Sequence, residues 1–132
     1  LGMAKVLVER HRGQVPTTLE ELTSLPGVGR KTANVVLGNA HGQQAIAVDT
    51  HVFRVSQRLG FAKSDNPEKI EQDLMSLLPK KDWFKVTYLL IDHGRAICTA
   101  KDPRCDLCPL SDLCPSAFRF PRFKKHAVDK AP

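Results

Sequence analysis

The sequence lacks any apolar run close to the ~18 residues that a membrane-spanning helix needs. No small-residue cleavage pattern follows the apolar start, so nothing indicates a secretory signal peptide. Position 1 is not methionine, and we therefore expect the chain to begin inside a longer protein. Internal repeats, low-complexity linkers and convincing strand patterns are also missing, which leaves an all-α fold as the prediction.

What is present describes a basic globular protein. The chain has 132 residues, 42% of them hydrophobic, with a net charge of +6. Its pI near 9.4 favours a polyanionic partner, with nucleic acid ahead of an acidic membrane surface. We expect no membrane partner.

Start and stop signals divide the chain into helices. Thr17 or Thr18 can cap a short helix that ends before Pro26, Asp49 can cap the helix that follows it, and Asn66 with Pro67 begins another. The predicted helices are 1–12, the short one before Pro26, 30–40, 50–59, 67–78 and 83–97, with Trp83, Phe84, Tyr88, Leu89 and Ile91 available for a core. Beyond Cys98, prolines and cysteines predict turns. We expect one part at 1–44 and a second at 45–132.

The stretch Leu25–Ala33, LPGVGRKTA, places two glycines around a valine directly before a predicted helix. Glycine adopts positive φ without a Cβ penalty, so this pattern is typical of a tight hairpin. The first N–H groups of the following helix have no partner inside it and form an anion site for a phosphate. Lys31 lies in the first turn, where the helix dipole disfavours a purely structural cation. Lys31 is therefore either a solvated surface lysine or a functional amine.

All four cysteines fall in one segment with the spacing C-x6-C-x2-C-x5-C: Cys98, Cys105, Cys108 and Cys114. Four thiols so close together can surround one metal centre, either zinc or a [4Fe–4S] cluster. Structural zinc usually joins two short Cys-x2-4-Cys units, and only the middle pair is that close, so the spacing favours the cluster. Disulfides are least favoured, because a disulfide framework spreads its cysteines and suits a secreted chain. Lys101 and Arg104 either face phosphate or offset the thiolate charge.

Three stretches in this order resemble the endonuclease III family of helix-hairpin-helix DNA glycosylases: Leu25–Ala33, Val48–Arg54 (VDTHVFR) and the cysteine segment 98–114. The resemblance covers nearly the whole chain, which looks like the C-terminal portion of such a protein. It implies a helix-hairpin-helix element and a helical domain that ends in a four-cysteine iron–sulfur loop. It also implies a base-excision-repair glycosylase with AP lyase activity. Such an enzyme flips out and removes an oxidised pyrimidine, and then nicks the abasic site by β-elimination.

The family's functional residues have counterparts in this sequence. Lys31 is similar to the amine that attacks C1′ and forms a Schiff base, and Asp49 is similar to the carboxylate that assists departure of the base. The four cysteines look like the ligands of the [4Fe–4S] cluster. The expected DNA contacts are Gly27, Val28, Gly29, Arg30 and Lys31. The resemblance further implies double-stranded DNA with a damaged base or abasic site as partner, a monomeric complete protein, and a bacterial-type cytoplasmic, nucleoid-associated location.

Other interpretations stay open for the whole chain. A cluster-containing adenine-mismatch glycosylase is similar over the hairpin and the cysteines, but such enzymes lack a lysine at the position of Lys31. A non-catalytic helix-hairpin-helix DNA-binding fragment needs neither Lys31 nor Asp49. A zinc-stabilised interaction domain is the third alternative. The family has further helices before the part seen here, so activity of this chain by itself is a separate question.

Individual residues also have simpler interpretations. Asp49 alone is favoured as a helix N-cap, which is compatible with a catalytic role. We expect His51 and His93 to be hydrogen-bonded structural histidines, and Trp83, Phe84 and Tyr88 to belong to the core. The tail 118–120, Phe-Arg-Phe, can stack on bases, but packing onto the cysteine segment is the favoured interpretation.

Overall fold

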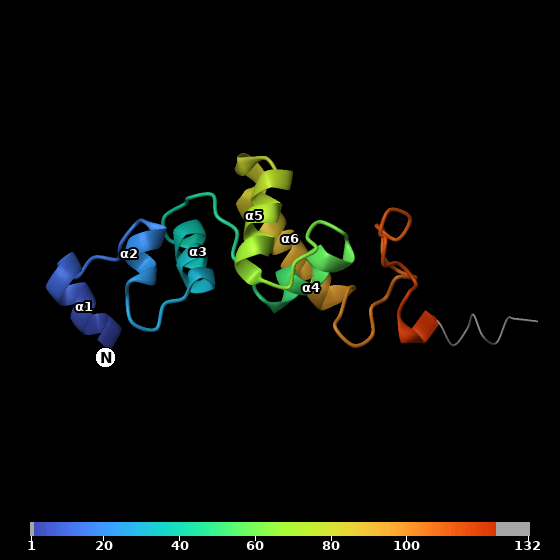
Figure 1. Cartoon of the computed structure of the whole chain (residues 1–132), viewed down its shortest axis with the longest axis horizontal. Coiled ribbons are helices and arrows are strands. Elements are labelled where there is room, and N and C mark those ends of the chain that lie inside the picture. Colours follow the sequence, from blue (N-terminus) through green and yellow to red (C-terminus); the bar gives the residue numbers. More distant parts are fainter. Residues whose placement is uncertain (1, 124–132) are drawn as a thin grey trace, which may run out of the picture.

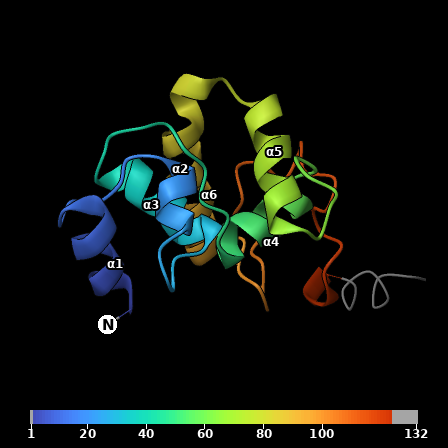
Figure 2. The same ribbon diagram turned by 60° about the vertical axis from the view of Figure 1, so that its left-hand side comes forward.

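The computed structural model describes residues 2–123, and within them it confirms an all-α fold without strands. Figure 1 shows the N-terminal helices at one end, the helices of residues 50–96 grouped together in the middle, and the cysteine segment, which contains only turns, at the other end; Figure 2 gives a second view. The helices are α1 (Gly2–His11), α2 (Leu19–Thr23), α3 (Arg30–Asn39), α4 (Thr50–Arg58), α5 (Pro67–Leu77), the 3-10 helix η1 (Lys80–Asp82) and α6 (Trp83–Ala96). Leu1 of the first predicted helix and residues 124–132 of the second predicted part lie outside the described residues.

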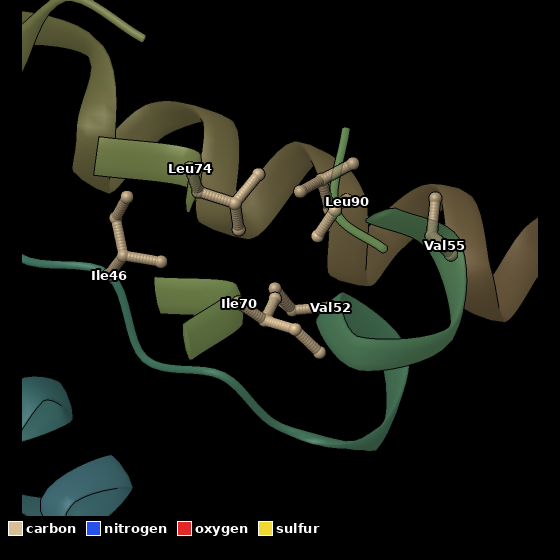
Figure 3. Packing of buried hydrophobic residues seen from close by; sticks show 7 residues of the cluster. Ile46, Val52, Val55, Ile70, Leu74 and Leu90 are labelled. Atoms are coloured by element: carbon tan, nitrogen blue, oxygen red, sulfur yellow. The ribbon is translucent and has the colours of Figure 1, made fainter. Parts of the chain in front are cut away.

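Buried side chains form two hydrophobic clusters. The N-terminal cluster joins α2, the hairpin and α3, and consists of Leu22, Leu25, Ala33, Leu37 and Ala45. The central cluster joins the 45–48 connector with α4, α5 and α6, and consists of Ile46, Val52, Val55, Ala62, Ile70, Leu74 and Leu90. Figure 3 shows how six of these central residues point toward one another. The connector changes from one cluster to the other between Ala45 and Ile46, and its residues 45–47 are buried.

Three predicted helix caps are present. The Thr18 hydroxyl accepts from the Glu21 N–H (3.2 Å), Asp49 Oδ1 accepts from the Val52 N–H (2.7 Å), and Asn66 Oδ1 accepts from the Glu68 N–H (2.9 Å). Each cap satisfies a donor that its helix leaves without an internal partner. The caps fix the starts of α2, α4 and α5, and therefore the positions of the segments that follow them.

The N-terminal half of α6 differs from the prediction. Tyr88 and Leu89, expected in the core, are 37% and 54% exposed, and Leu90 is the side chain that enters the central cluster. Tyr88 lies on the face toward α3, where its hydroxyl accepts from Asn39 Nδ2 (2.7 Å). Asp82, the residue before α6, makes no side-chain cap; the Gln44 side chain accepts from the Phe84 N–H instead (3.0 Å). These contacts come from residues distant in sequence, so the local pattern did not indicate them.

The end of α3 packs directly on α6. A Cβ added at Gly38 would lie 2.7 Å from the ring of Phe84, so only glycine allows this close approach. Trp83 is half-buried against the central cluster, with its indole N–H donating to the Leu78 carbonyl (3.0 Å).

Within residues 2–123, no helix is both long enough and apolar enough to cross a membrane.

Candidate functional site

The hairpin before α3 is shaped by its glycines. Gly27 has φ +81°, which requires glycine for an unstrained turn, and the Val28 N–H donates to the Leu25 carbonyl (3.2 Å) across it. A Cβ added at Gly27 or Gly29 would meet nothing within 4 Å, so this face of the hairpin is open. No acceptor in residues 2–123 takes the N–H groups of 29–32, at the positive end of the α3 dipole. The arrangement suits an anion that approaches from solvent.

Lys31 and Asp49 come from different helices and face the same cavity. Lys31 is exposed in the first turn of α3, and Asp49 is the half-buried N-cap of α4. Together with Val48, Thr50, Phe53 and Pro67, they line one cavity. Because only one oxygen of Asp49 is used in the cap, the second has no donor within the described residues. An amine and a free carboxylate oxygen therefore share one solvent-accessible space.

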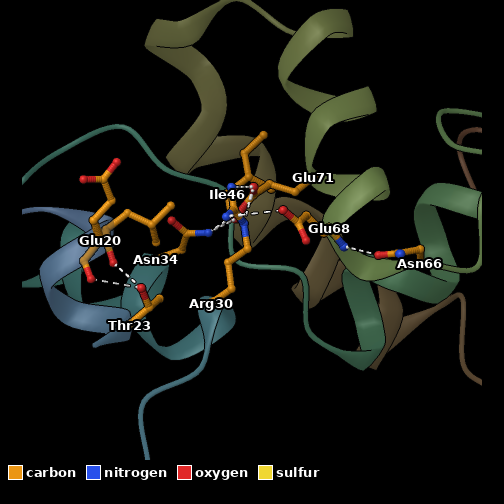
Figure 4. Close-up of polar contacts among 9 residues, drawn as sticks. Glu20, Thr23, Arg30, Asn34, Ile46, Asn66, Glu68 and Glu71 are labelled. Carbon is orange, nitrogen blue, oxygen red and sulfur yellow. Dashed lines mark hydrogen bonds and ion pairs between the residues drawn. The ribbon is translucent and has the colours of Figure 1, made fainter. Parts of the chain in front are cut away.

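A buried polar cluster lies beside that cavity and was not identified from the sequence. Glu71 of α5 is only 2% exposed, and its Oε2 accepts from Arg30 Nε (2.8 Å) and Nη2 (2.6 Å). Its other oxygen accepts from the Asn34 side chain, which also donates to the Ile46 carbonyl (3.0 Å). Figure 4 shows these side chains converging from α3, α5 and the connector. The hydrogen bond that Arg30 donates to Glu71 raises the pKa of Arg30 above its already high ordinary value.

The sequence predicts that Arg30 contacts DNA, but in this structure the Arg30 side chain pairs with carboxylates of α5. Besides Glu71, its guanidinium lies 3.6 Å from Glu68 Oε1. Its charge is therefore balanced by two carboxylates in this structure. A role for Arg30 in contacting phosphate stays a prediction. The only signal for the cluster was the presence of two charged residues, Glu71 and Asp73, between Ile70 and Leu74, and helical spacing alone does not reveal which of them is buried.

The four cysteines surround a single cavity at the end of α6. All four thiols are free and half-buried, and they line the cavity with side chains that include Arg58, His93, Pro103 and Phe120. Within residues 2–123 no three His, Cys, Asp or Glu side chains are placed to hold one metal ion. Four thiols around one almost wholly apolar cavity suit a group that takes one sulfur ligand at each corner, as a [4Fe–4S] cluster does.

An arginine side chain also contacts one of the thiols. Arg58 of α4 lies 3.4 Å from Cys98 Sγ and donates to the carbonyls of Thr99 (2.8 Å) and Ala100 (3.1 Å). Its guanidinium also stacks over the Phe120 ring at 4.5 Å, and Phe120 lines the cavity of the four cysteines, whereas Phe118 is 48% exposed. Hydrogen bonds to thiolate sulfur are one of the means by which proteins tune such clusters. The sequence did not single out Arg58.

The histidines and the loop charges have local partners. His93 Nε2 lies 3.6 Å from Cys108 Sγ, and burial lowers the pKa of this imidazole. His51 Nδ1 lies 3.1 Å from Arg54 Nη2. Arg104, one of the two cations considered between the cysteines, pairs with Asp106 at 3.2 Å, so its charge is already balanced locally.

Family models match both the hairpin region and the cysteine segment. Residues 10–38 match the helix-hairpin-helix motif, and residues 98–114 match the iron–sulfur binding domain of endonuclease III. The matched segment contains all four cysteines, which confirms the predicted [4Fe–4S] cofactor.

Curated relatives match over most of this chain. It is 53% identical over 117 residues to endonuclease III of Synechocystis sp., covering 88% of this chain and 53% of that protein. It is 50% identical over 113 residues to endonuclease III of Bacillus subtilis, covering 85% of this chain and 52% of that protein. The chain thus spans about half the length of the curated relatives it matches.

Solved structures agree with the sequence relatives. A trapped endonuclease III–DNA covalent intermediate, an estranged-adenine complex, is similar with a TM-score of 0.85 at 45% identity, covering 89% of this chain and 56% of that one. A thermostable thymine-DNA glycosylase is similar with a TM-score of 0.78 at 26% identity, covering 94% of this chain and 56% of that one. With its hairpin, its cysteine segment and these relatives, the chain belongs to the endonuclease III family, to whose C-terminal portion it corresponds.

Proposed function

We propose that this chain carries the catalytic groups of a base-excision DNA glycosylase with AP lyase activity. The observation that carries the proposal is the shared cavity of Lys31 and Asp49, which adjoins an open hairpin with unpaired amides. The similarity to a trapped endonuclease III–DNA covalent intermediate supports it, because a covalent intermediate requires a nucleophile. The lysine also favours a lyase over the adenine-mismatch branch.

In the proposed reaction, the Lys31 amine attacks C1′ of the damaged nucleotide as the C1′–N bond to the base breaks. The base leaves with the bonding electron pair and a proton, and ring opening gives a Schiff base between Lys31 and C1′. The iminium acidifies the C2′ proton, so its removal expels the 3′ phosphate by β-elimination. Water then hydrolyses the Schiff base and regenerates the amine. Asp49 stabilises cationic character on the sugar and assists the proton transfers.

Substrate binding is proposed to depend mainly on the DNA backbone. The hairpin residues 27–31 contact the DNA, with the unpaired amides of 29–31 holding a phosphate, and the net charge of +6 attracts the duplex. The target nucleotide, an oxidised pyrimidine, is flipped out of the stack so that C1′ reaches Lys31. We further propose that the complete protein acts as a monomer on nucleoid DNA in a bacterial cytoplasm.

Cys98, Cys105, Cys108 and Cys114 are the proposed ligands of the [4Fe–4S] cluster. When bound, the cluster supplies a covalent cross-link for a segment that contains turns only. Arg58 offers N–H groups to the Cys98 sulfur, and His93 lies beside the Cys108 sulfur.

We also propose that the chain divides at 44/45, as the sequence predicts, close to where the connector passes from one hydrophobic cluster to the other.

Borohydride trapping on abasic DNA tests the function. Borohydride reduces a Schiff base to a stable amine, so the parent protein becomes crosslinked to DNA, whereas Lys31→Gln forms no adduct and still binds DNA. The assay uses this chain alone and this chain joined behind the N-terminal portion of the Bacillus subtilis relative. Cluster absorbance and helix content must match between variants.

Two results contradict the proposal. If folded, cluster-loaded Lys31→Gln is trapped as efficiently as the parent, the nucleophile lies elsewhere. If the hybrid binds abasic DNA but gives no adduct, the lyase activity is wrong and a non-catalytic DNA-binding module is favoured. Trapping by the hybrid but not by the chain alone assigns a necessary role to the added portion and leaves Lys31 as the nucleophile.

A further inference from the structure

Glu71 occupies an unusual position for a carboxylate. It is only 2% exposed, and its helix neighbours Ile70 and Leu74 are both fully buried in the central cluster. A buried charge is costly unless it is paired and hydrogen-bonded. Here both oxygens are used, one by Arg30 and the other by Asn34. Glu71 is therefore held on α5 by the buried side chains of Ile70 and Leu74, and both of its carboxylate oxygens have hydrogen-bond donors.

The partners of Glu71 belong to the two segments that carry the proposed catalytic residues. Arg30 directly precedes Lys31 in the first turn of α3, and Asn34 lies one turn further along the same helix. Asn34 also donates to the Ile46 carbonyl (3.0 Å), and the connector reaches Asp49 three residues later. One carboxylate thus connects to α3 directly and to the segment before Asp49 through a single amide.

The cavities around these groups are adjacent. Glu71, Arg30 and Asn34 line one cavity, and Lys31 and Asp49 line another. Both cavities are also bordered by the same three side chains, which are Lys31, Val48 and Pro67. The buried polar cluster is therefore immediately behind the proposed reaction site rather than in a remote part of the core.

We infer that Glu71 is a positioning residue, which holds the first turns of α3 and the connector before α4 in the relation that brings Lys31 and Asp49 to one cavity. The chemical consequence rests on the proposed function. The planar guanidinium of Arg30 accepts only a narrow range of carboxylate positions, so the pair fixes orientation as well as distance. Misplacement of a reacting group by about 1 Å can cost on the order of 100-fold in rate.

Glu68 provides a matched control. It lies one turn earlier on α5 and also faces Arg30, but its side chain is 58% exposed and its nearest approach is 3.6 Å. Glu71→Gln and Glu68→Gln each remove one negative charge beside the same arginine. Only Glu71→Gln disturbs the buried connection, so a difference between the two variants measures positioning rather than local charge.

Hydrogen–deuterium exchange of the cluster-loaded chain is the first measurement. In Glu71→Gln, we expect the hydrogen-bonded amides in 33–37 and the amides in 46–52 to exchange about 10-fold faster or more, because both segments lose their common anchor. Exchange in α6 stays unchanged, and Glu68→Gln matches the parent throughout. If Glu71→Gln leaves exchange in both segments unchanged, the inference is wrong, whatever the activity. If that variant does not fold, Glu71→Asp, which keeps the charge but has a shorter reach, is measured by the same criteria.

Single-turnover borohydride trapping with the hybrid protein is the second measurement. We expect Glu71→Gln to slow adduct formation by about 10- to 100-fold, while Kd for abasic DNA changes less than about 3-fold. Glu71→Asp gives an intermediate rate, and Glu68→Gln stays within about 2-fold of the parent. A parental rate in Glu71→Gln, with Lys31→Gln inactive, overturns the positioning role and leaves the proposed function intact. If the parent does not trap, the proposed function fails, and the exchange experiment still decides whether Glu71 holds the two segments.

Discussion

Between Leu19 and Ala96 the chain folds around buried aliphatic side chains, whereas from Cys98 to Ala117 only Pro103 is buried. The first region satisfies its backbone groups within helices, and the second does so with isolated turns such as Cys108 N–H to the Cys105 carbonyl (3.3 Å). Apolar burial therefore stabilises one region and cannot stabilise the other. The cysteine segment has no hydrophobic core of its own, so its fold depends on the bound cluster for stability.

Arg58 is the main polar connection between the two regions. It belongs to α4, next to the central cluster, and it donates to carbonyls of the first residues of the cysteine segment. Leu107 and Leu113 of the segment are 65% and 85% exposed, so they add little apolar packing against the helices. We therefore predict that a substitution that unfolds or destabilises one region leaves the structure of the other region largely unchanged.

The largest expected effect comes from removing a proposed cluster ligand. Cys105→Ser or Cys108→Ser should abolish the visible absorbance of the cluster and make the segment after Ile97 accessible to protease, with cleavage faster by about 10-fold or more. Helix content by circular dichroism should change little, because all the helices from α1 to α6 precede the segment.

Asp112→Asn is the control for these cysteine variants, since it changes an exposed residue of the same segment. It should keep the absorbance and the protease resistance of the parent. Stoichiometric zinc without iron in anaerobically purified protein would contradict the cofactor. Loss of most helical signal in Cys105→Ser would show that the two regions do not behave separately.

The sequence predicted the helical region well where its signals are local. Capping residues such as Thr18 and Asn66 act on amides two or three residues away, so helix starts were confirmed closely. The face of α6 was predicted less well, because the exposure of Tyr88 and Leu89 depends on where α3 packs. Periodicity gives the faces of a helix but does not say which partner each face meets.

The candidate site shows the same division between local and distant signals. Lys31 and Asp49 belong to recognisable stretches, so they were identified before any geometry was known. Glu71 and Arg58 were missed, because each acquires its importance from partners about forty residues away along the chain. A buried glutamate and an exposed one look alike in a helical sequence pattern.

A second prediction concerns the helical region alone. Leu74→Ala should lower the free energy of unfolding by about 2–5 kcal/mol, because Leu74 is fully buried in the central cluster. Leu77→Ala on the same helix, at 54% exposure, should change it by less than about 0.5 kcal/mol. Denaturant unfolding followed by circular dichroism measures both. Equal effects would mean that α5 does not pack as described.

The smallest expected effect on stability separates the two roles of Asp49. Asparagine caps helices about as well as aspartate, so Asp49→Asn should change the free energy of unfolding by only a few tenths of a kcal/mol, whereas Asp49→Ala should cost about 1 kcal/mol. Both variants should slow base excision by the hybrid protein, because both lose the carboxylate charge that faces the cavity. Some lyase activity on a preformed abasic site should survive in Asp49→Asn, since no base has to depart.

Thr18→Ala is the matched cap control, because Thr18 caps α2 away from the cavity. It should lower stability about as much as Asp49→Ala, by about 1 kcal/mol, and leave excision unchanged. The comparison is made on protein with parental cluster absorbance, so that folding differences do not enter the rates. If Asp49→Asn excises at the parental rate, the carboxylate serves only as an N-cap, and catalytic assistance must come from another group. If Asp49→Ala and Thr18→Ala slow excision equally, the effect of Asp49→Ala follows helix stability and not charge. A slow but stable Asp49→Asn, beside a less stable but active Thr18→Ala, assigns the negative charge of Asp49 to the reaction.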